Sequence, residues 1–375
     1  MYKILVAGCG FAGSTIARIL AENGFKVTLI EKRNHVGGNA FDFINDKKER
    51  IHKYGPHLFH CNKESSALVF LNRFTEWILY KHKVRAKISD NKTTPLPVNR
   101  NTLEDVFNIK LKDEKETIDF IGSLRVNEIK PKNTDQLFLS SYGEVISNIF
   151  FRPYTRKMWG VPPNKLDISV GARLPFKNNR DDFYFNDNFQ ALPKKGYTKL
   201  FENMLDHKNI ELKLNTVFEK NMEKDFDHSF LSIPIDGYFN YKFGKLPYRS
   251  ILFENVITDT IQDAPVINFT DNDVYTRSTQ WHLFPNSPDL ERDQYTSTLE
   301  KPCSLDQNPG EYYYPIKTKD SKELYDKYFT KAKEIKNITF IGRTGLFIYI
   351  DMAPATTLHI KIAKDFLKSR NLLIN

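Results

Sequence analysis

Cysteine is scarce in this chain of 375 residues. The three that are present, Cys9, Cys61 and Cys303, are far apart, and none belongs to a CxxC pair. This usage excludes a disulfide framework and a zinc ribbon, and it is typical of the reducing cytosol. The apolar run at the N-terminus, Ile4 to Ala7, is too short for the hydrophobic segment of a secretory signal. We therefore expect a cytoplasmic protein.

Long hydrophobic runs and dense clusters of one charge are also missing. The apolar stretches fall well short of the roughly 18 residues that cross a bilayer, so we expect no stable membrane insertion. The 55 Lys and Arg exceed the 46 Asp and Glu, a net charge of +9. These charges are dispersed, which is typical of a solvated surface; among partners, this pattern favours an anionic small molecule over nucleic acid. No cluster has metal-ligand spacing, and no metal site is predicted.

The first 31 residues have the pattern of a strand, a tight turn, a helix and a second strand. The apolar run Lys3 to Ala7 leads into the turn Gly8-Cys9-Gly10-Phe11-Ala12-Gly13, and the apolar run Lys26 to Ile30 ends at Glu31. Continuous apolar runs are typical of parallel strands buried on both faces. This order predicts a βαβ unit.

The glycines of this turn have the spacing of a dinucleotide-binding motif. Glycine permits a close backbone approach, the helix N-terminus stabilises pyrophosphate, and Glu31 can accept hydrogen bonds from ribose hydroxyls. A second pair, Gly37-Gly38, follows closely and favours FAD over NAD; a glycine turn in an unrelated α/β fold is the alternative. The predicted cofactor-binding residues here are Gly8, Gly10, Phe11, Ala12, Gly13, Glu31, Lys32, Gly38 and Asn39.

The middle of the chain changes pattern twice. Apolar residues recur at helical spacing between about 100 and 160, which predicts an inserted helical domain. Short alternating runs between about 210 and 300 predict an antiparallel sheet, with strands at Glu211 to Leu214, Val266 to Phe269 and Trp281 to Phe284. The end of the chain returns to an apolar strand and a final helix near Met352 to Lys368, which Asp351 is placed to cap.

Several segments in one order resemble a single family. Tyr54 to His60, of sequence YGPHLFH, is similar to a segment of the UDP-galactopyranose mutases of bacteria. The resemblance recurs through nearly the whole chain, in Pro95 to Asn99, Tyr154 to Gly160, Ala172 to Pro175, Asp182 to Asn186, Gly196 to Lys199, Tyr275 to Arg277, Tyr313 to Pro315, Gly342 to Arg343 and Tyr349 to Met352. Several motifs in one order are more specific than any single one.

The resemblance implies an α/β fold with a discontinuous Rossmann-like FAD-binding domain, an inserted helical domain and an antiparallel β-sheet domain. The expected FAD-binding parts are residues 1–75, 195–235 and 330–375. The helical domain is expected at 98–160, and the sheet or substrate domain at 76–97, 161–194 and 236–329. A homodimer is implied by the family alone.

The implied activity is that of an isomerase, the interconversion of pyranose and furanose forms of a nucleotide-diphosphate sugar for polysaccharide such as O-antigen. In that family reduced FAD is thought to attack the anomeric carbon through its N5 and to form a sugar adduct. The protein then supplies positioning and electrostatics.

The resemblance also implies site residues. A leaving diphosphate needs positive charge and hydroxyl donors, and bases stack on aromatic rings. The residues expected to be catalytic are Arg173, Arg277, His60 and Tyr349. Substrate binding is expected from Phe150, Phe151, Tyr154, Thr155, Trp159, Tyr184, Asn268 and Tyr314, and further cofactor binding from His57, Arg343, Asp351 and Met352.

Three segments depart from the family pattern, all at the expected sugar end. They are Lys81-His82-Lys83, where an asparagine-arginine pair is usual, Gln280-Trp281-His282, and Ala353-Pro354. A 6-deoxy sugar, as in dTDP-fucopyranose, or UDP-N-acetylgalactosamine is therefore an alternative to UDP-galactopyranose. An FAD-dependent oxidase and a binding module without flavin chemistry are alternatives from other classes.

Overall fold

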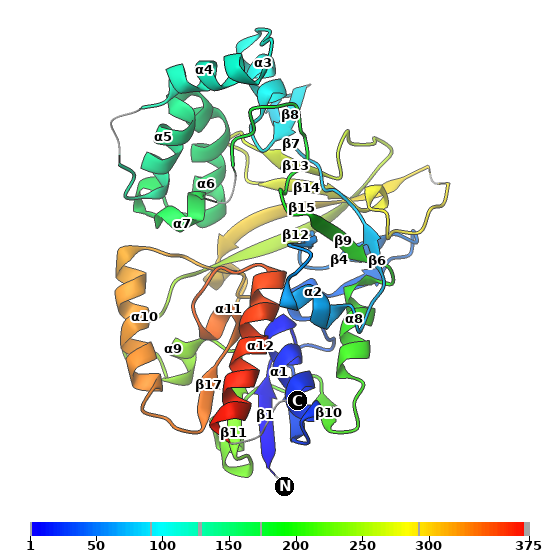
Figure 1. Cartoon of the computed structure of the whole chain (residues 1–375), viewed down its shortest axis with the longest axis vertical. Helices are drawn as coiled ribbons and strands as arrows, with labels where there is room; N and C mark the ends of the chain where they lie inside the picture. Colours follow the sequence, from blue (N-terminus) through cyan, green and yellow to red (C-terminus); the bar gives the residue numbers. More distant parts are fainter. Residues whose placement is uncertain (1, 91, 127–129, 173–174, 292, 371–375) are drawn as a thin grey trace.

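The structure, a computed structural model, describes residues 2–90, 92–126, 130–172, 175–291 and 293–370 (Figure 1). A parallel sheet near both chain ends has the strand order β10-β2-β1-β11-β17. Its strands are β1 (Lys3–Ala7), β2 (Lys26–Ile30), β10 (Ile210–Lys213), β11 (His228–Leu231) and β17 (Ile338–Phe340). The predicted βαβ unit is confirmed, because β1 and β2 pair in parallel and the chain forms a helix between them.

The prediction that Glu211 to Leu214 belongs to an antiparallel sheet is wrong. This segment forms β10, which pairs in parallel with β2, with Leu212 opposite Leu29. β10 lies at the edge of the sheet and is largely exposed, so its sequence alternates apolar and polar residues, as that of a half-buried antiparallel strand does.

Helices cover both faces of this sheet. Alternate residues of β1 point to opposite sides: Ile4 and Val6 pack with one cluster of buried residues, Leu5 and Ala7 with another. The first side carries α1 (Phe11–Glu22), α2 (Ser66–Leu71), α8 (Gly196–Leu205) and α12 (Met352–Ser369). The second carries α9 (Ile235–Tyr238) and α10 (Lys319–Ala332), and α11 (Gly342–Gly345) follows β17.

A second, seven-stranded sheet has the order β16-β12-β15-β14-β13-β7-β8 and is antiparallel except for the pair β13 and β7. Its strands are β7 (Val84–Ser89), β8 (Lys92–Leu96), β12 (Tyr248–Thr258), β13 (Val266–Phe269), β14 (Arg277–Gln280), β15 (Tyr295–Ser304) and β16 (Tyr314–Pro315). The strand predicted at Val266 to Phe269 is confirmed.

The strand predicted at Trp281 to Phe284 is wrong: Trp281–Leu283 is a 3₁₀ turn after β14. Trp281 is fully buried, its indole N–H donates to Thr298 Oγ1 at 2.7 Å, and its ring lies 5.1 Å from that of His52. The turn allows Phe284 to reach His52 as well, at 6.3 Å. Burial of both rings on one side thus determines the local conformation.

Two small sheets connect the larger parts. They are the hairpin β3 (Asp42–Ile44) with β4 (Arg50–His52), and the sheet β5-β9-β6, formed by β5 (Phe59–Cys61), β6 (Trp77–Leu79) and β9 (Phe189–Pro193).

The spacing of apolar residues predicts helices between about 100 and 160, and helices are found there. They lie at the top left of Figure 1. Its helices are α3 (Arg100–Phe107), α4 (Glu114–Leu124), α5 (Thr134–Ile146), a π-helical stretch (Ser147–Phe151), α6 (Arg152–Trp159) and α7 (Ile168–Gly171). Asn99, Asp113 and Asn133 cap α3, α4 and α5 by accepting backbone N–H groups. Within the described ranges, no helix is long and apolar enough to span a membrane.

Candidate active site

The glycine turn between β1 and α1 is sterically tight. Gly8 has a φ of +97°, and a Cβ on Gly13 would lie 1.8 Å from the Gly8 carbonyl oxygen. The second glycine pair packs against this turn, because a Cβ on Gly38 would lie 3.0 Å from the Gly10 Cα. Side chains are therefore excluded where a pyrophosphate would approach the backbone.

Glu31, at the end of β2, is held by backbone groups of both segments. Its Oε2 accepts the Cys9 N–H at 3.0 Å, and its Oε1 accepts the Arg33 N–H at 3.1 Å. The residue is 6% exposed and lines the adjacent cavity. Each carboxylate oxygen can accept a further bond from a ligand hydroxyl.

A cavity of about 700 Å³ opens at the carboxyl ends of β1, β2, β11 and β17. This is where open α/β sheets bind ligands. Gly13 shapes the turn, and the other predicted cofactor-binding residues line the cavity: Gly8, Gly10, Phe11, Ala12, Glu31, Lys32, Gly38, Asn39, His57, Arg343, Asp351 and Met352. The residues around it fit a dinucleotide.

Arg277 is the centre of a second polar cluster, on the seven-stranded sheet. It lies opposite Glu300 in the β14–β15 register, with its Nη1 3.5 Å from Glu300 Oε1, and its Nη2 donates to the Tyr154 hydroxyl at 3.2 Å. Burial raises the pKa of Glu300, and the charge of Arg277 opposes that rise. The guanidinium thus stays charged beside phenols and one carboxylate, as anion binding requires.

Aromatic rings and a second arginine surround the neighbouring space. The rings of Tyr314 and Tyr349 are 5.0 Å apart and nearly perpendicular, and that of Trp159 lies 5.9 and 5.8 Å from them. The Arg343 guanidinium lies 5.2 Å from the Tyr314 ring and 5.4 Å from the Tyr349 ring. A smaller cavity of about 180 Å³ is lined by Trp159, Tyr349 and Asp351.

His57 connects the cofactor-type cavity with the arginine cluster. Its Nδ1 lies 2.7 Å from the Gly55 carbonyl oxygen, and its backbone N–H donates to His52 Nδ1 at 3.0 Å. Burial lowers the pKa of His57 to about 3, with the charges of Arg343 and Arg277 contributing. His57 is neutral at pH 7 and lies within the field of both arginines.

His60 makes a different set of contacts. Its Nδ1 lies 2.8 Å from Asp187 Oδ2, and its ring stacks on Phe185 with centroids 3.7 Å apart. The carboxylate fixes which ring nitrogen carries the proton, so Nε2 is directed away from Asp187.

The comparisons with known proteins agree on one family. The family model described as UDP-galactopyranose mutase matches residues 149–349. A protein of Klebsiella pneumoniae named probable UDP-galactopyranose mutase is 34% identical over 371 residues, covering 98% of this chain and 95% of that protein.

This chain belongs to the UDP-galactopyranose mutase family.

Other matches agree with this family and with the fold. The dTDP-fucopyranose mutase of Escherichia coli is 35% identical, covering 98% of this chain and 99% of that protein. The crystal structure of a reduced UDP-galactopyranose mutase superposes with a TM-score of 0.77 at 18% identity, covering 98% and 94% of the two chains. A putative protoporphyrinogen oxidase of Exiguobacterium superposes at 0.67 with 12% identity. A model of an NAD(P)-binding Rossmann-like domain matches residues 6–74.

The chain is therefore an enzyme, an isomerase of the mutase kind, and its relatives point to a flavin cofactor. The resemblance stated from the motifs is confirmed, as is the α/β fold with parallel and antiparallel sheets.

Some residues expected to bind substrate lie elsewhere than at the cavity surface. Phe150 and Phe151 are 2% and 5% exposed, and the Phe151 ring stacks on that of Phe138 at 4.9 Å. Asn268 lies opposite Arg277 in the β13–β14 register, and no hydrogen-bond partner for its buried Oδ1 is found in the described part of the chain. Thr155 is buried on α6, and Arg173 lies outside the described residues.

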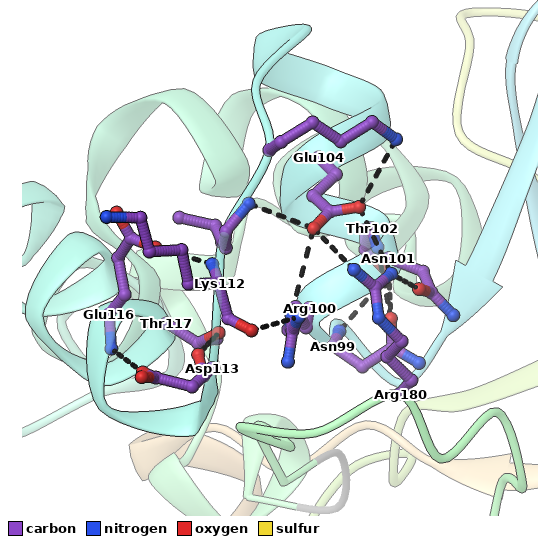
Figure 2. A network of polar contacts seen from close by, with 12 residues as sticks. Asn99, Arg100, Asn101, Thr102, Glu104, Lys112, Asp113, Glu116, Thr117 and Arg180 are labelled. Carbon is purple, nitrogen blue, oxygen red and sulfur yellow. Dashed lines mark hydrogen bonds and ion pairs between the residues drawn. The ribbon is translucent and has the colours of Figure 1, made fainter.

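Two features were missed from the sequence. Glu300 lies in an ordinary strand pattern, and only its pairing with Arg277 distinguishes it. The other is a polar network that attaches residues 177–183 to α3 (Figure 2). Arg180 donates to both carboxylate oxygens of Glu104, at 2.7 and 3.1 Å, and the Leu111 N–H donates to Glu104 Oε1 at 3.0 Å.

The attached segment continues into the site. Lys177 N–H donates to the Val98 carbonyl at 3.0 Å, and Asn99 Nδ2 donates to Asp182 Oδ1 at 2.8 Å. The next residue but one, Tyr184, donates its N–H to the His82 carbonyl at 2.7 Å. α3 thus holds the backbone that leads to Tyr184.

Proposed function

We propose that this protein is an FAD-dependent mutase that interconverts the pyranose and furanose forms of a nucleotide-diphosphate sugar. The observation that carries the proposal is the junction at His57: a dinucleotide-type cavity meets a half-buried arginine, Arg277, which is surrounded by tyrosines. A redox cofactor beside an anion-binding cluster, rather than beside an apolar tunnel, favours a mutase over an oxidase.

FAD fits the residues present. The glycine turn would accept a pyrophosphate without steric conflict, Glu31 has acceptor capacity for a ribose, and Arg343, Asp351 and Met352 line the same cavity and would hold the remainder of the cofactor. When bound in its reduced form, FAD would supply a nucleophilic nitrogen, N5. The side chains position the sugar and stabilise the diphosphate.

The diphosphate is proposed to bind to two arginines and three tyrosines: Arg173, Arg277, Tyr154, Tyr184 and Tyr314. Each hydrogen bond from a charged group contributes roughly 1.5–3 kcal/mol, and the contribution grows as charge develops on the leaving group. Trp159 is proposed to stack on the base and Tyr349 to bind near the sugar. Glu300, buried beside Arg277, orients the guanidinium and limits its positive field.

The test is an assay of furanose product from UDP-galactopyranose by chromatography, with the purified protein in the presence and absence of dithionite. We expect bound flavin to be released as FAD and turnover to require reductant although no net oxidation occurs. Undiminished turnover by oxidised enzyme, or a tightly bound NAD, would contradict the proposal.

A second substrate, a dTDP-linked 6-deoxyhexose, is favoured by one observation. His82, in the segment where the family usually shows an asparagine-arginine pair, is a buried neutral ring with Tyr184, Phe185 and Phe284 around it. Such surroundings suit a methyl group better than a hydroxyl. The same assay with dTDP-fucopyranose and UDP-N-acetylgalactosamine distinguishes the sugars. A homodimer is also proposed, from the family, and light scattering tests it.

A further inference from the structure

The backbone after α9 is strained at one residue whose side chain the turn does not require. Asn240 and Tyr241 both adopt left-handed conformations, with φ of 51° and 56°. Their N–H groups donate to the carbonyls of Gly237 and Asp236, at 3.0 and 2.8 Å, which ends the helix. Asparagine and glycine are ordinary residues for such a helix end, whereas a bulky ring in this region is rare and costly.

The Tyr241 side chain lies at the surface of the large cavity. It is 44% exposed and lines that cavity together with Tyr238, Asn240 and Tyr312. Burial and the neighbouring Tyr241 together raise the pKa of Tyr312 to about 12. The Lys245 ammonium lies 5.6 Å from the Tyr241 ring centroid. An exposed aromatic ring is thus held in place at a cost in backbone energy.

This aromatic end of the cavity continues from Glu31. The Thr216 N–H donates to the Glu31 carbonyl at 2.8 Å, so residues 216–218 lie beside the proposed ribose contact. Val217, 64% exposed, lines the cavity there, and the Phe218 ring lies 6.3 Å from that of Tyr238. His57 and Arg343 also line the cavity, at the end that joins the arginine cluster. A dinucleotide that fills the cavity with one ribose on Glu31 therefore places the base attached to that ribose at the tyrosine end.

We propose that Tyr241 stacks on the adenine ring of FAD and makes the site selective for FAD over FMN. This inference rests on the proposed function, because it takes FAD as the cofactor. A flat heterocycle gains from contact with an aromatic face, and a ring that is already fixed loses little freedom on binding. Such a gain offsets the strain at Tyr241 only when the adenosine half is present.

The experiment compares Tyr241→Gly and Tyr241→Phe with the wild type, after removal of flavin. Glycine relieves the left-handed strain and removes the ring, whereas phenylalanine keeps both. The affinities for FAD and for FMN are measured by quenching of flavin fluorescence, and the stability of the flavin-free protein by thermal unfolding. Lys48→Gly is the matched control, because Lys48 also has a positive φ, 61°, but lies in the turn between β3 and β4, away from the cavity lining.

We expect Tyr241→Gly to bind FAD about tenfold more weakly, as the loss of one stacked base predicts, and FMN unchanged. Its melting temperature should not fall below that of the wild type, and Tyr241→Phe should retain nearly full FAD affinity. Lys48→Gly should leave both flavin affinities unchanged.

Two results overturn the inference: unchanged FAD affinity in Tyr241→Gly, or an equal loss for FAD and FMN. If the wild type binds neither flavin, the proposed function itself fails. If the wild type binds both equally well, the cofactor assignment survives and the adenine contact does not.

Discussion

His359, on α12, accepts a hydrogen bond from the backbone N–H of Gly342, with His359 Nε2 2.9 Å from the Gly342 nitrogen. The histidine is fully buried, and its Nδ1 lies 2.6 Å from the Ala355 carbonyl, which places the proton on Nδ1. Gly342 has a φ of +70°, and a Cβ there would lie 2.3 Å from Ser232 Oγ. α12 therefore holds the turn from which Arg343 enters the cavity.

Replacing His359 by leucine is expected to weaken flavin binding. The change keeps the bulk but leaves the Gly342 N–H without its acceptor, which costs about 1–3 kcal/mol. His228→Leu is the control, because His228 is also buried but bonds Thr339 Oγ1 at 2.9 Å, on the neighbouring strand. Flavin titration should separate the two variants; equal affinities would show that the Gly342 turn needs no support from His359.

The free energy of unfolding of the flavin-free protein is expected to fall already below pH 6.5, where carboxylates are still ionised. Burial lowers the pKa of His52, His57 and His82 to about 3, and that of His228 to about 4, from 6.5. Below pH 6.5 the unfolded chain binds protons at these groups and the native protein does not, so the free energy of unfolding falls with pH. Each group contributes up to about 1.4 kcal/mol per pH unit.

Denaturant titrations at pH 7, 6 and 5 measure how steeply the free energy of unfolding changes with pH, which is the slope in question. His228→Leu should make it shallower by about the contribution of one group. A slope identical to that of the wild type would mean that His228 is protonated in the native protein.

Arg277→Lys should reduce mutase activity by about a hundredfold while flavin stays bound. Lysine keeps the charge but cannot contact Glu300 and Tyr154 with two separate nitrogens, so the ion pair with Glu300 and the hydrogen bond to Tyr154 are not both kept. Arg85→Lys is the control on the same sheet, since Arg85 bonds Thr93 and Asp263. Initial rates, with the flavin content of each variant, provide the measurement. Near-normal activity of Arg277→Lys would rule out the two-pronged contact.

Glu104→Gln should loosen residues 177–183 and lower stability at pH 7 by roughly 1.5–3 kcal/mol. The Arg180 guanidinium lowers the pKa of Glu104 from 4.5 to about 2, so the stability difference from the wild type should shrink as pH falls from about 5 towards 2. Asp135→Asn is the control, because Asp135 makes a similar paired contact with Arg152, at 2.7 and 3.0 Å, within the helical part.

Hydrogen exchange of the Lys177 and Phe183 amides reports on the segment. Faster exchange in Glu104→Gln than in Asp135→Asn is the expected result. The same exchange rate in both variants would mean that the network in Figure 2 does not hold this segment.

His82→Asn should change the preference among UDP-galactopyranose, UDP-N-acetylgalactosamine and dTDP-fucopyranose, whereas Gln280→Glu should not. Gln280 is engaged by the backbone, since its Nε2 donates to the Thr260 carbonyl at 2.7 Å and its Oε1 accepts the Gln262 N–H at 2.8 Å. A carboxylate there repels the carbonyl and costs stability. Competition assays with the three substrates compare the variants, and a preference altered by Gln280→Glu alone would reverse the assignment.

The local features of the fold follow from the pattern of residues along the chain. Gly8 and Gly13 predict the turn, because Gly8 has a positive φ and a Cβ on Gly13 would clash with the Gly8 carbonyl oxygen, and Glu31 follows from the length of one strand, helix and strand. The apolar run of β1 and the helical spacing after residue 100 are likewise set by which neighbours along the chain are buried.

The contacts between segments that are distant in the sequence depend on how the elements pack. Arg277 meets Glu300 through strand register, and His359 meets Gly342 through the packing of a helix on a turn. Trp281 leaves the strand conformation because its burial against His52 outweighs local alternation. Such contacts depend on which surfaces are brought together in the core, and this cannot be predicted from the spacing of residues along the chain.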